Sequence, residues 1–82
     1  MKKNGIIINK ETVTYYKNGK IHREDGPAVE YRDGTKEWWL NGNLHREDGP
    51  AVEWGNGYKE WWIDGEQITE EEFNQIQESK QA

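Results

Sequence analysis

Cysteine and long apolar runs are both missing from this sequence, and each absence excludes a class of protein. None of the 82 residues is a cysteine, so disulfide bonds and thiolate metal sites are excluded, which fits a reducing compartment such as the cytosol. The longest aliphatic run is the three isoleucines at 6–8, far too short for a membrane span or an export signal. We therefore expect a cytoplasmic protein without a membrane partner.

Aliphatic side chains are also scarce. Only 13 of the 82 residues are Leu, Ile, Val or Phe, and so low a fraction together with a high net charge is typical of disorder. The net charge here is only −5, however, and five tryptophans and four tyrosines are present. Because a Trp or Tyr side chain buries roughly 150–250 Å², these rings replace the missing aliphatic area. The composition predicts one small domain over 1–82 with a thin, aromatic core.

A basic surface is the third feature that the sequence lacks. Residues 1–63 contain ten Lys or Arg and ten Asp or Glu, so the whole net charge of −5 belongs to 64–82. Aromatic rings are able to stack on bases, but affinity for phosphates needs a basic groove. The charge distribution therefore argues against a nucleic-acid partner.

An internal repeat is the strongest signal that is present. The segment His-Arg-Glu-Asp-Gly-Pro-Ala-Val-Glu occurs at 22–30 and again at 45–53, an offset of 23 residues. At the same offset, the segment at 36–42 recurs at 59–65 with two conservative changes. Stepping 23 residues back from the second copy reaches a degenerate first copy, in which Tyr15-Tyr16 replace two tryptophans. The chain therefore contains three copies of one supersecondary unit.

Each copy reads as strand, tight turn, strand and tight turn. Asn-Gly or Asp-Gly dipeptides, which suit two-residue type I′ hairpin turns, stand at 18–19, 33–34, 41–42, 56–57 and 64–65. One hairpin is marginal alone, and stacking three of them stabilises a sheet. The sequence thus predicts a mainly β fold, an antiparallel meander of three 23-residue hairpin repeats over 5–68.

The carboxyl-terminal segment differs from the repeats. Thr69 is followed three residues later by a glutamate, which is the pattern of a capping box, and Ile68 and Phe73 occupy the positions of a hydrophobic staple. We predict one C-terminal α-helix over 69–80, with Phe73 and Ile76 covering part of the core. Capping and solubility would explain its acidic first turn, and the alternative is that the acidic helix belongs to the binding surface.

Two-residue turns would also fix the register of the sheet. Around 33–34 they pair Glu30 with Glu37 and Val29 with Trp38. At the other turns they pair Tyr16 with Ile21, Trp39 with Leu44, Tyr15 with His22, and Trp61 with Ile68. The predicted core face then carries Ile6, Ile8, Tyr15, His22, Val29, Tyr31, Trp38, His45, Val52, Trp54, Trp61 and Ile68.

The opposite face of this predicted sheet supplies the candidate binding residues. An aromatic row amid charges usually marks an interaction site when it is exposed. The predicted binding residues are Tyr16, Trp39, Trp62, Glu30, Glu37, Glu53 and Glu60. Arg46 would neutralise the row of Glu30 and Glu37, whereas the third copy has Thr69 in its place and would leave Glu53 and Glu60 to a partner's cation. The alternatives are that these rings pack on the return strands or on a second copy, and that the carboxylates are merely solvated.

Catalysis and metal binding are weighed on the repeated His-Arg-Glu-Asp sequence. A histidine next to carboxylates suits acid–base or metal chemistry, but an active site is normally built once, whereas His22 and His45 occur in two copies. We therefore expect structural histidines, with Asp25 or Asp48 holding a ring nitrogen. No catalytic residue, metal ligand or cofactor is predicted.

The repeat resembles a known family. Residues 38–51 read Trp-Trp-Leu-Asn-Gly-Asn-Leu-His-Arg-Glu-Asp-Gly-Pro-Ala, similar to the W-Y-x-N-G-x-x-H-R-x-D-G-P-A units of bacterial and bacteriophage proteins, and more distantly to MORN-type and YwqK-like antitoxin repeats. The resemblance covers 12–65 well and 5–9 weakly. It implies a hairpin-repeat fold. Together with the small, acidic chain, the phage-like repeat predicts a non-enzymatic, phage-type accessory protein that binds a host protein such as a defence effector, and either inhibits that protein or only binds it.

Two other function classes stay open. One is a homodimeric structural or assembly module whose aromatic face meets a second copy. The other is a small-ligand or nucleotide-binding protein with His22, His45 and the aromatic rings as its pocket.

Overall fold

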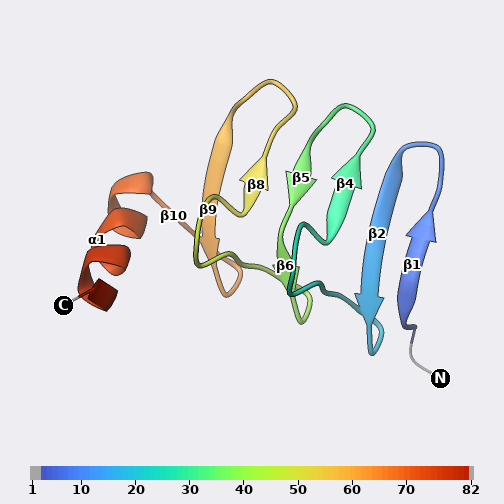
Figure 1. Cartoon of the computed structure of the whole chain (residues 1–82), viewed down its shortest axis with the longest axis horizontal. Helices are drawn as coiled ribbons and strands as arrows, with labels where there is room; N and C mark the ends of the chain where they lie inside the picture. Colours follow the sequence, from blue (N-terminus) through green and yellow to red (C-terminus); the bar gives the residue numbers. More distant parts are fainter. Residues whose placement is uncertain (1–2, 82) are drawn as a thin grey trace.

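The computed structural model describes residues 3–81 as a thin plate built from antiparallel strands, with one helix at its carboxyl end (Figure 1). The plate measures 42 × 31 × 18 Å. The elements are β1 (Gly5–Ile8), β2 (Thr12–Lys17), β3 (Lys20–Ile21), β4 (Val29–Tyr31), β5 (Lys36–Glu37), β6 (Trp39–Leu40), β7 (Asn43–Leu44), β8 (Val52–Glu53), β9 (Lys59–Ile63), β10 (Glu66–Ile68) and α1 (Glu70–Gln81). The larger sheet runs β1-β2-β4-β5-β8-β9-β10. The predicted mainly β, antiparallel, meander-like fold is confirmed.

Every repeat has an upper hairpin and a lower hairpin in the view of Figure 1. The upper hairpins are β1–β2, β4–β5 and β8–β9, and each stands beside the next because β2 pairs with β4 and β5 pairs with β8. The lower hairpins are β2–β3, β6–β7 and β9–β10. In the first repeat, for example, the upper half of β2 pairs with β4 of the next repeat, and the lower half of β2 pairs with β3 of its own repeat.

The lower turns are the predicted two-residue type. Asn18, Asn41 and Asp64 have φ of 52°, 51° and 49°, and the glycine after each also has positive φ. Two successive residues with positive φ define the type I′ turn. Tyr16 consequently pairs with Ile21, Trp39 with Leu44 and Trp61 with Ile68, as predicted.

The upper turns differ from the prediction by one residue. Gly34 has φ of 95° but Asp33 does not have positive φ, and the Tyr31 N–H donates to the Thr35 carbonyl at 2.8 Å, which closes a three-residue loop. Asp33 Oδ1 accepts the Thr35 N–H at 2.8 Å, and this bond lowers the pKa of the Asp33 carboxyl. An Asx bond of this kind holds the aspartate in a non-left-handed turn position, which a type I′ turn would not allow.

This one-residue difference changes the register of the upper sheet. Val29 pairs with Glu37 and Glu30 with Lys36, so the predicted Glu30–Glu37 and Val29–Trp38 pairs are wrong. The third unit repeats the arrangement, with Val52 opposite Glu60.

Because successive side chains of a strand point to opposite faces of the sheet, shifting the pairing by one residue moves every side chain of that strand to the other face. The front face, defined by Glu37, Trp39, Glu60 and Trp62, also carries Val29, Tyr31, Val52 and Trp54. These last four residues were predicted on the face of Trp38 and Trp61, here called the back face. Glu30 and Glu53 lie instead on the back face, beside Lys36 and Lys59.

The core is a narrow band across the middle of the plate. Ala28 and Ala51 are fully buried and Val29 and Val52 nearly so. The Tyr15 N–H donates to the Ala28 carbonyl, and the equivalent bond joins Trp38 to Ala51. A small residue thus stands beside an aromatic one at each junction between repeats, while the rings themselves are only half-buried.

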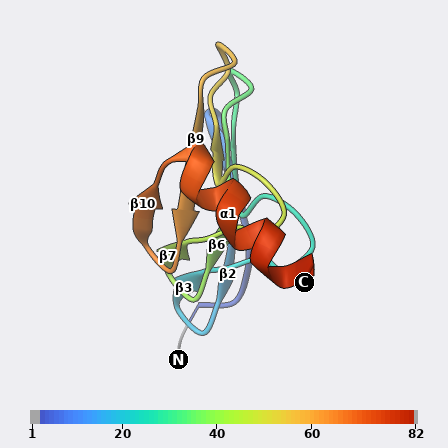
Figure 2. The ribbon, with the colours of Figure 1, turned by 90° about the vertical axis from the view of Figure 1, so that its left-hand side faces the viewer.

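Helix α1 crosses the end of the sheet next to β9 and β10 (Figure 2). Both bonds of the predicted capping box are present, since Glu72 N–H donates to Thr69 Oγ1 and Thr69 N–H donates to a Glu72 carboxylate oxygen. Phe73 is buried as expected, but Ile76 remains 37% exposed. No helix in residues 3–81 is long and apolar enough to cross a membrane.

Candidate functional site

Two glutamates on the front face each hold two aromatic side chains. Glu37 Oε1 accepts the Trp39 Nε1–H at 2.9 Å, and its Oε2 accepts the Tyr31 hydroxyl at 3.3 Å. Twenty-three residues further on, Glu60 accepts Trp62 Nε1–H at 2.9 Å and Trp54 Nε1–H at 2.8 Å. We call each such arrangement a glutamate clamp.

The local sequence explains the clamps. Residues two apart on a strand share a face, which places Glu37 beside Trp39. The pairing of Val29 with Glu37 then brings Tyr31, two residues after Val29, to the other side of the same carboxylate. The clamp therefore depends on the three-residue upper turn.

The clamped rings form a partly exposed surface, which we call the aromatic–carboxylate face. Trp54 is 43% exposed and Tyr31 37%, while Tyr16, Trp39 and Trp62 are half-buried. Corresponding residues lie two strands apart, which is roughly 10 Å. The face consists of Tyr16, Tyr31, Trp39, Trp54, Trp62, Glu37 and Glu60.

Two electrostatic effects act on the rings of this face. Burial, followed by the negative charge of Glu37, raises the pKa of the Tyr31 hydroxyl, so this hydroxyl stays a donor at neutral pH. At the amino end, Lys3 Nζ lies 4.8 Å from the centre of the Tyr16 ring, a cation–π contact.

The predicted site residues divide between the two faces. Tyr16, Trp39, Trp62, Glu37 and Glu60 lie together on the front face as expected. Glu30 and Glu53 do not, and the Arg46 Nη1 atom lies 3.1 Å from Glu53 Oε2. The expectations that Arg46 neutralises Glu30 and Glu37, and that Glu53 has no arginine, are therefore wrong, because Arg46 reaches the back face.

Sequence reasoning missed Tyr31 and Trp54 as members of this face. Like charges directly opposite each other destabilise a sheet, and the predicted register opposed Glu30 to Glu37. Shifting it by one residue opposes Glu30 to Lys36, a pairing of opposite charges. This charge rule is the signal that would have found both rings.

Arginines cover aromatic rings on the back face. The Arg23 guanidinium lies 4.1 Å from the Tyr15 ring centre, and that of Arg46 lies 3.9 Å from Trp38. Arg46 Nε donates to Asp48 at 2.9 Å and its Nη1 donates to the Pro50 carbonyl. Arg23 makes the equivalent bonds to Asp25 and to a proline carbonyl. The bond to Asp25 raises the pKa of Arg23, and the same bond lowers the pKa of Asp25.

The two histidines connect adjacent repeats. His22 Nδ1 accepts the Asn41 N–H, and His45 Nδ1 accepts the Asp64 N–H, both at 2.9 Å. In each ring, Nε2 lies 3.1 Å from the glutamate two residues later, which is Glu24 or Glu47. The expectation that Asp25 or Asp48 holds the ring nitrogen is wrong, because these aspartates bind the arginines.

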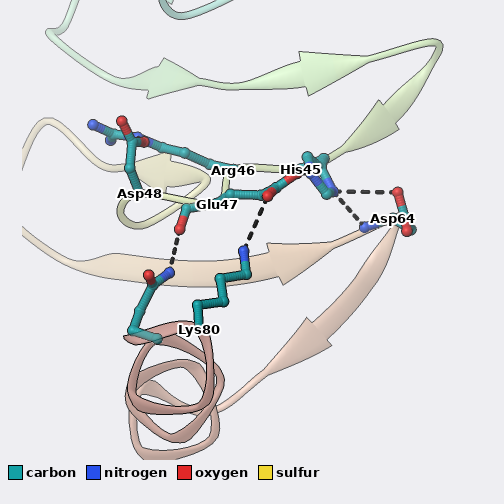
Figure 3. A network of polar contacts seen from close by, with 7 residues as sticks. His45, Arg46, Glu47, Asp48, Asp64 and Lys80 are labelled. Atoms are coloured by element: carbon teal, nitrogen blue, oxygen red, sulfur yellow. Dashed lines mark hydrogen bonds and ion pairs between the residues drawn. The ribbon is translucent and has the colours of Figure 1, made fainter. Parts of the chain in front are cut away.

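Glu47 also connects the second repeat to the helix (Figure 3). Lys80 Nζ donates to Glu47 Oε1 at 3.0 Å, and the Gln77 side-chain amide donates to the Glu47 carbonyl. The hydrogen bond from His45, followed by that from Lys80, lowers the pKa of the Glu47 carboxyl. One glutamate thus fixes both a histidine and the last turn of α1.

A cavity of about 570 Å³ lies between the two His-Arg-Glu-Asp loops on the back face, with Trp38 and Leu40 among its lining residues. Its arginines already bind Asp25 and Asp48. Within residues 3–81, His, Cys, Asp and Glu form no group of three or more arranged to hold a metal ion.

Comparison with protein-family models, with curated protein sequences and with solved structures matches nothing.

Proposed function

We propose that this chain is a non-enzymatic recognition module that binds a partner protein through its aromatic–carboxylate face. The observation that carries the proposal is the repeated glutamate clamp, which holds Tyr31 and Trp54 in fixed, partly exposed positions. Rings that are already ordered lose little conformational entropy when a partner binds them. The face is therefore preorganised for association.

The chemistry of the face suits a protein surface. Aromatic residues are enriched among the side chains that contribute most to protein–protein binding. The clamp carboxylates lie among the rings, so the face offers both an apolar contact and negative charge. A partner presenting arginine or lysine side chains would make cation–π contacts with the rings and ion pairs with Glu37 and Glu60.

The hydrogen bonds of the two histidines support a non-enzymatic function. Both ring nitrogens of His22 and of His45 have hydrogen-bond partners that join one repeat to the next or lie within the same loop. General acid–base catalysis needs a ring nitrogen within reach of a substrate. These rings are occupied by the fold itself.

The resemblance of the repeat to phage and bacterial units extends the proposal. We further propose that the partner is a host protein in the bacterial cytosol, such as a defence effector, and that binding of this chain inhibits that protein. This part is supported by the sequence pattern of 38–51 alone.

Affinity capture from a bacterial lysate tests the proposal. The immobilised wild-type chain is compared with Tyr31→Ala/Trp54→Ala, which removes the exposed half of the face, and with Trp39→Ala/Trp62→Ala. Ile8→Ala is the matched control, because it removes an apolar side chain that is 73% exposed on the edge strand β1 and does not belong to the aromatic–carboxylate face. We expect a specific partner to be retained by the wild-type chain and the control and lost from both double variants. A folded double variant that retains the same partner at full yield would contradict the proposal.

Light scattering separates this proposal from the homodimer alternative. A monomer at micromolar concentration is expected. A dimer that dissociates in Tyr31→Ala/Trp54→Ala would show instead that a second copy covers the face.

A further inference from the structure

The upper hairpins of the first and second repeats are each covered on one side by the first strand of the next repeat. Strand β4 adds to β2, with Glu30 opposite Val13, and β8 adds to β5, with Glu53 opposite Lys36. Both added strands carry the sequence Pro-Ala-Val-Glu, at 27–30 and 50–53. The alanine and valine of each copy are buried. The chain thus shows twice which segment this position accepts.

The third repeat has no such strand. The residues at the corresponding position, 75–77, belong to α1. Pairing of β9 with β10 extends only from Trp61 to Ile63, so the upper half of β9 has β8 on one side and no strand on the other among the described residues. The backbone N–H of Trp54 donates to the backbone carbonyl of Tyr58, so this carbonyl points toward β8. Along a strand of an antiparallel pair, the backbone groups of successive residues point alternately toward the partner strand and away from it. The N–H and carbonyl of Lys59 therefore point away from β8.

Exposure marks the same position. In the second repeat Thr35 is 4% exposed, and its Oγ1 accepts the Gly55 N–H of the next hairpin at 3.0 Å. Tyr58, its counterpart in the third repeat, is 62% exposed. A cavity of about 500 Å³ lies here, lined by residues that include Tyr58, just before β9, Lys59 and Trp61 on β9, and Thr69 just before α1. Figure 2 shows the tip of the β8–β9 hairpin rising beyond α1.

We propose that the open edge of β9 at Lys59 is a strand-docking site for an extended segment of a partner protein. The segment has the chemistry of Pro-Ala-Val-Glu, a small residue followed by a β-branched and an acidic one. Its glutamate lies opposite Lys59, as Glu53 lies opposite Lys36. Addition of a strand to a sheet edge is a common mode of peptide recognition. The inference rests on the proposed function only in taking the partner to be a protein.

A second copy of this chain is the less suitable occupant. Its Pro-Ala-Val-Glu segments are buried in its own sheet, and its first repeat is already closed at the lower turn. There the Gly19 N–H donates to the Lys3 carbonyl and the Asn18 N–H donates to Asn4 Oδ1. These bonds occupy the two lower-turn donors that would otherwise bind acceptors of a preceding copy.

A peptide with the sequence Asp-Gly-Pro-Ala-Val-Glu-Tyr, that of residues 25–31, tests the site on the full chain. We expect saturable binding, with NMR shift changes centred on Tyr58 and Lys59 and with protection of the Lys59 amide from hydrogen exchange. Lys59→Pro removes the outward N–H and leaves the bonds to β8 in place, so the affinity should fall at least tenfold. Lys59→Ala keeps the N–H and is the matched control, with a change of less than threefold.

Two modified peptides keep the test valid if Lys59→Pro does not fold. Methylation of the peptide's glutamate nitrogen removes the donor that faces β9, and we expect at least a tenfold loss. Methylation of its valine nitrogen, which faces away from β9, should leave binding unchanged. Equal binding of both peptides, or no saturable binding of the parent peptide at millimolar concentration, would overturn the proposal.

Two further outcomes are informative. Protection of the Lys59 amide that grows with protein concentration in the absence of peptide would show that a second copy fills the edge, and it would overturn the assignment to a partner. The Tyr31→Ala/Trp54→Ala variant should still bind the peptide. This result distinguishes a failure of the aromatic–carboxylate face from a failure of the docking site.

Discussion

The Nδ1 atom of His45 accepts the backbone N–H of Asp64 at 2.9 Å, so a side chain of the second repeat holds the turn of the third. His22 and Asn41 make the same bond one repeat earlier. In the first repeat, Asn4 Oδ1 accepts the Asn18 N–H in the corresponding place. Side-chain acceptors thus fix every lower turn that has positive φ.

Replacing His45 should reveal the stabilising effect of this bond. In His45→Ala the Asp64 N–H loses its acceptor and a buried ring is removed, so we expect a loss of about 1–3 kcal/mol in the free energy of unfolding. Urea unfolding followed by tryptophan fluorescence measures it. His45→Asn supplies the kind of acceptor that Asn4 supplies, so it should destabilise less than His45→Ala. Equal losses in the two variants would contradict a role for the acceptor.

Gly55 should tolerate no side chain. A Cβ atom built at this position would lie 2.2 Å from the Asp33 carbonyl oxygen of the neighbouring hairpin, so Gly55→Ala must separate the two tips. We expect a loss of about 2 kcal/mol or more. Gly34→Ala is the comparison, because it has ordinary space but φ of 95°, and left-handed strain alone amounts to roughly 1–2 kcal/mol. Thermal unfolding of both variants should place Gly55→Ala lower.

The helix cap offers a prediction confined to α1. Thr69→Ala removes the acceptor of the Glu72 N–H, and loss of such a cap typically amounts to about 1 kcal/mol. Thr69→Ser keeps the hydroxyl and should behave like the wild-type chain. Far-ultraviolet circular dichroism follows the helix, and NMR shows whether the sheet is unchanged. If Thr69→Ala retains full helix content and stability, the cap contributes nothing.

Acid should weaken the contact between α1 and the second repeat. The pKa of Glu47 is lowered by the hydrogen bond from His45 and then by that from Lys80. A carboxyl whose pKa is lower in the folded chain contributes stability above the ordinary glutamate pKa, about 4.3, and this contribution disappears as the pH falls through the folded value.

An NMR titration of the Glu47 carboxyl checks this prediction. In Lys80→Met the pKa should rise toward the ordinary value but remain below it, because the larger cause, His45, is retained. The matched variant Lys36→Met changes a lysine with no contact to Glu47 and should leave the pKa where it is. An unshifted pKa in the wild-type chain would refute the pairing.

The repeat, the lower turns and the helix cap were predictable because each depends on neighbouring residues. An Asn-Gly pair at 41–42 gives a type I′ turn, and Thr69 with Glu72 gives a capping box, without reference to distant parts of the chain. The register around 33–34 was not predictable from the dipeptide alone, since Asp-Gly also fits a three-residue loop. There the bond from the Thr35 N–H to Asp33 decides between two turns of similar sequence.

The composition of the candidate site followed from that register. Trp39 and Trp62 were placed correctly because they depend on the lower turns, whereas Tyr31 and Trp54 depend on the upper turns and were placed on the wrong face. The open edge of β9 exists because α1 takes up the residues that would form a fourth first strand. The helix itself was predicted, but no docking site was inferred from it, because the pairing of β9 with its neighbours depended on the register of the sheet.

The fixed 23-residue interval between equivalent contacts has a consequence for how such a chain could be lengthened. Residues that belong to the repeats make all the described contacts between neighbouring copies. Lys3 and Asn4 contact only the first copy, and α1 lies only at the last. Duplication of the middle copy would therefore add one more glutamate clamp at a spacing of roughly 10 Å and leave both ends as they are. The length of the plate therefore depends on the number of copies, and each added copy would extend the row of clamps by one.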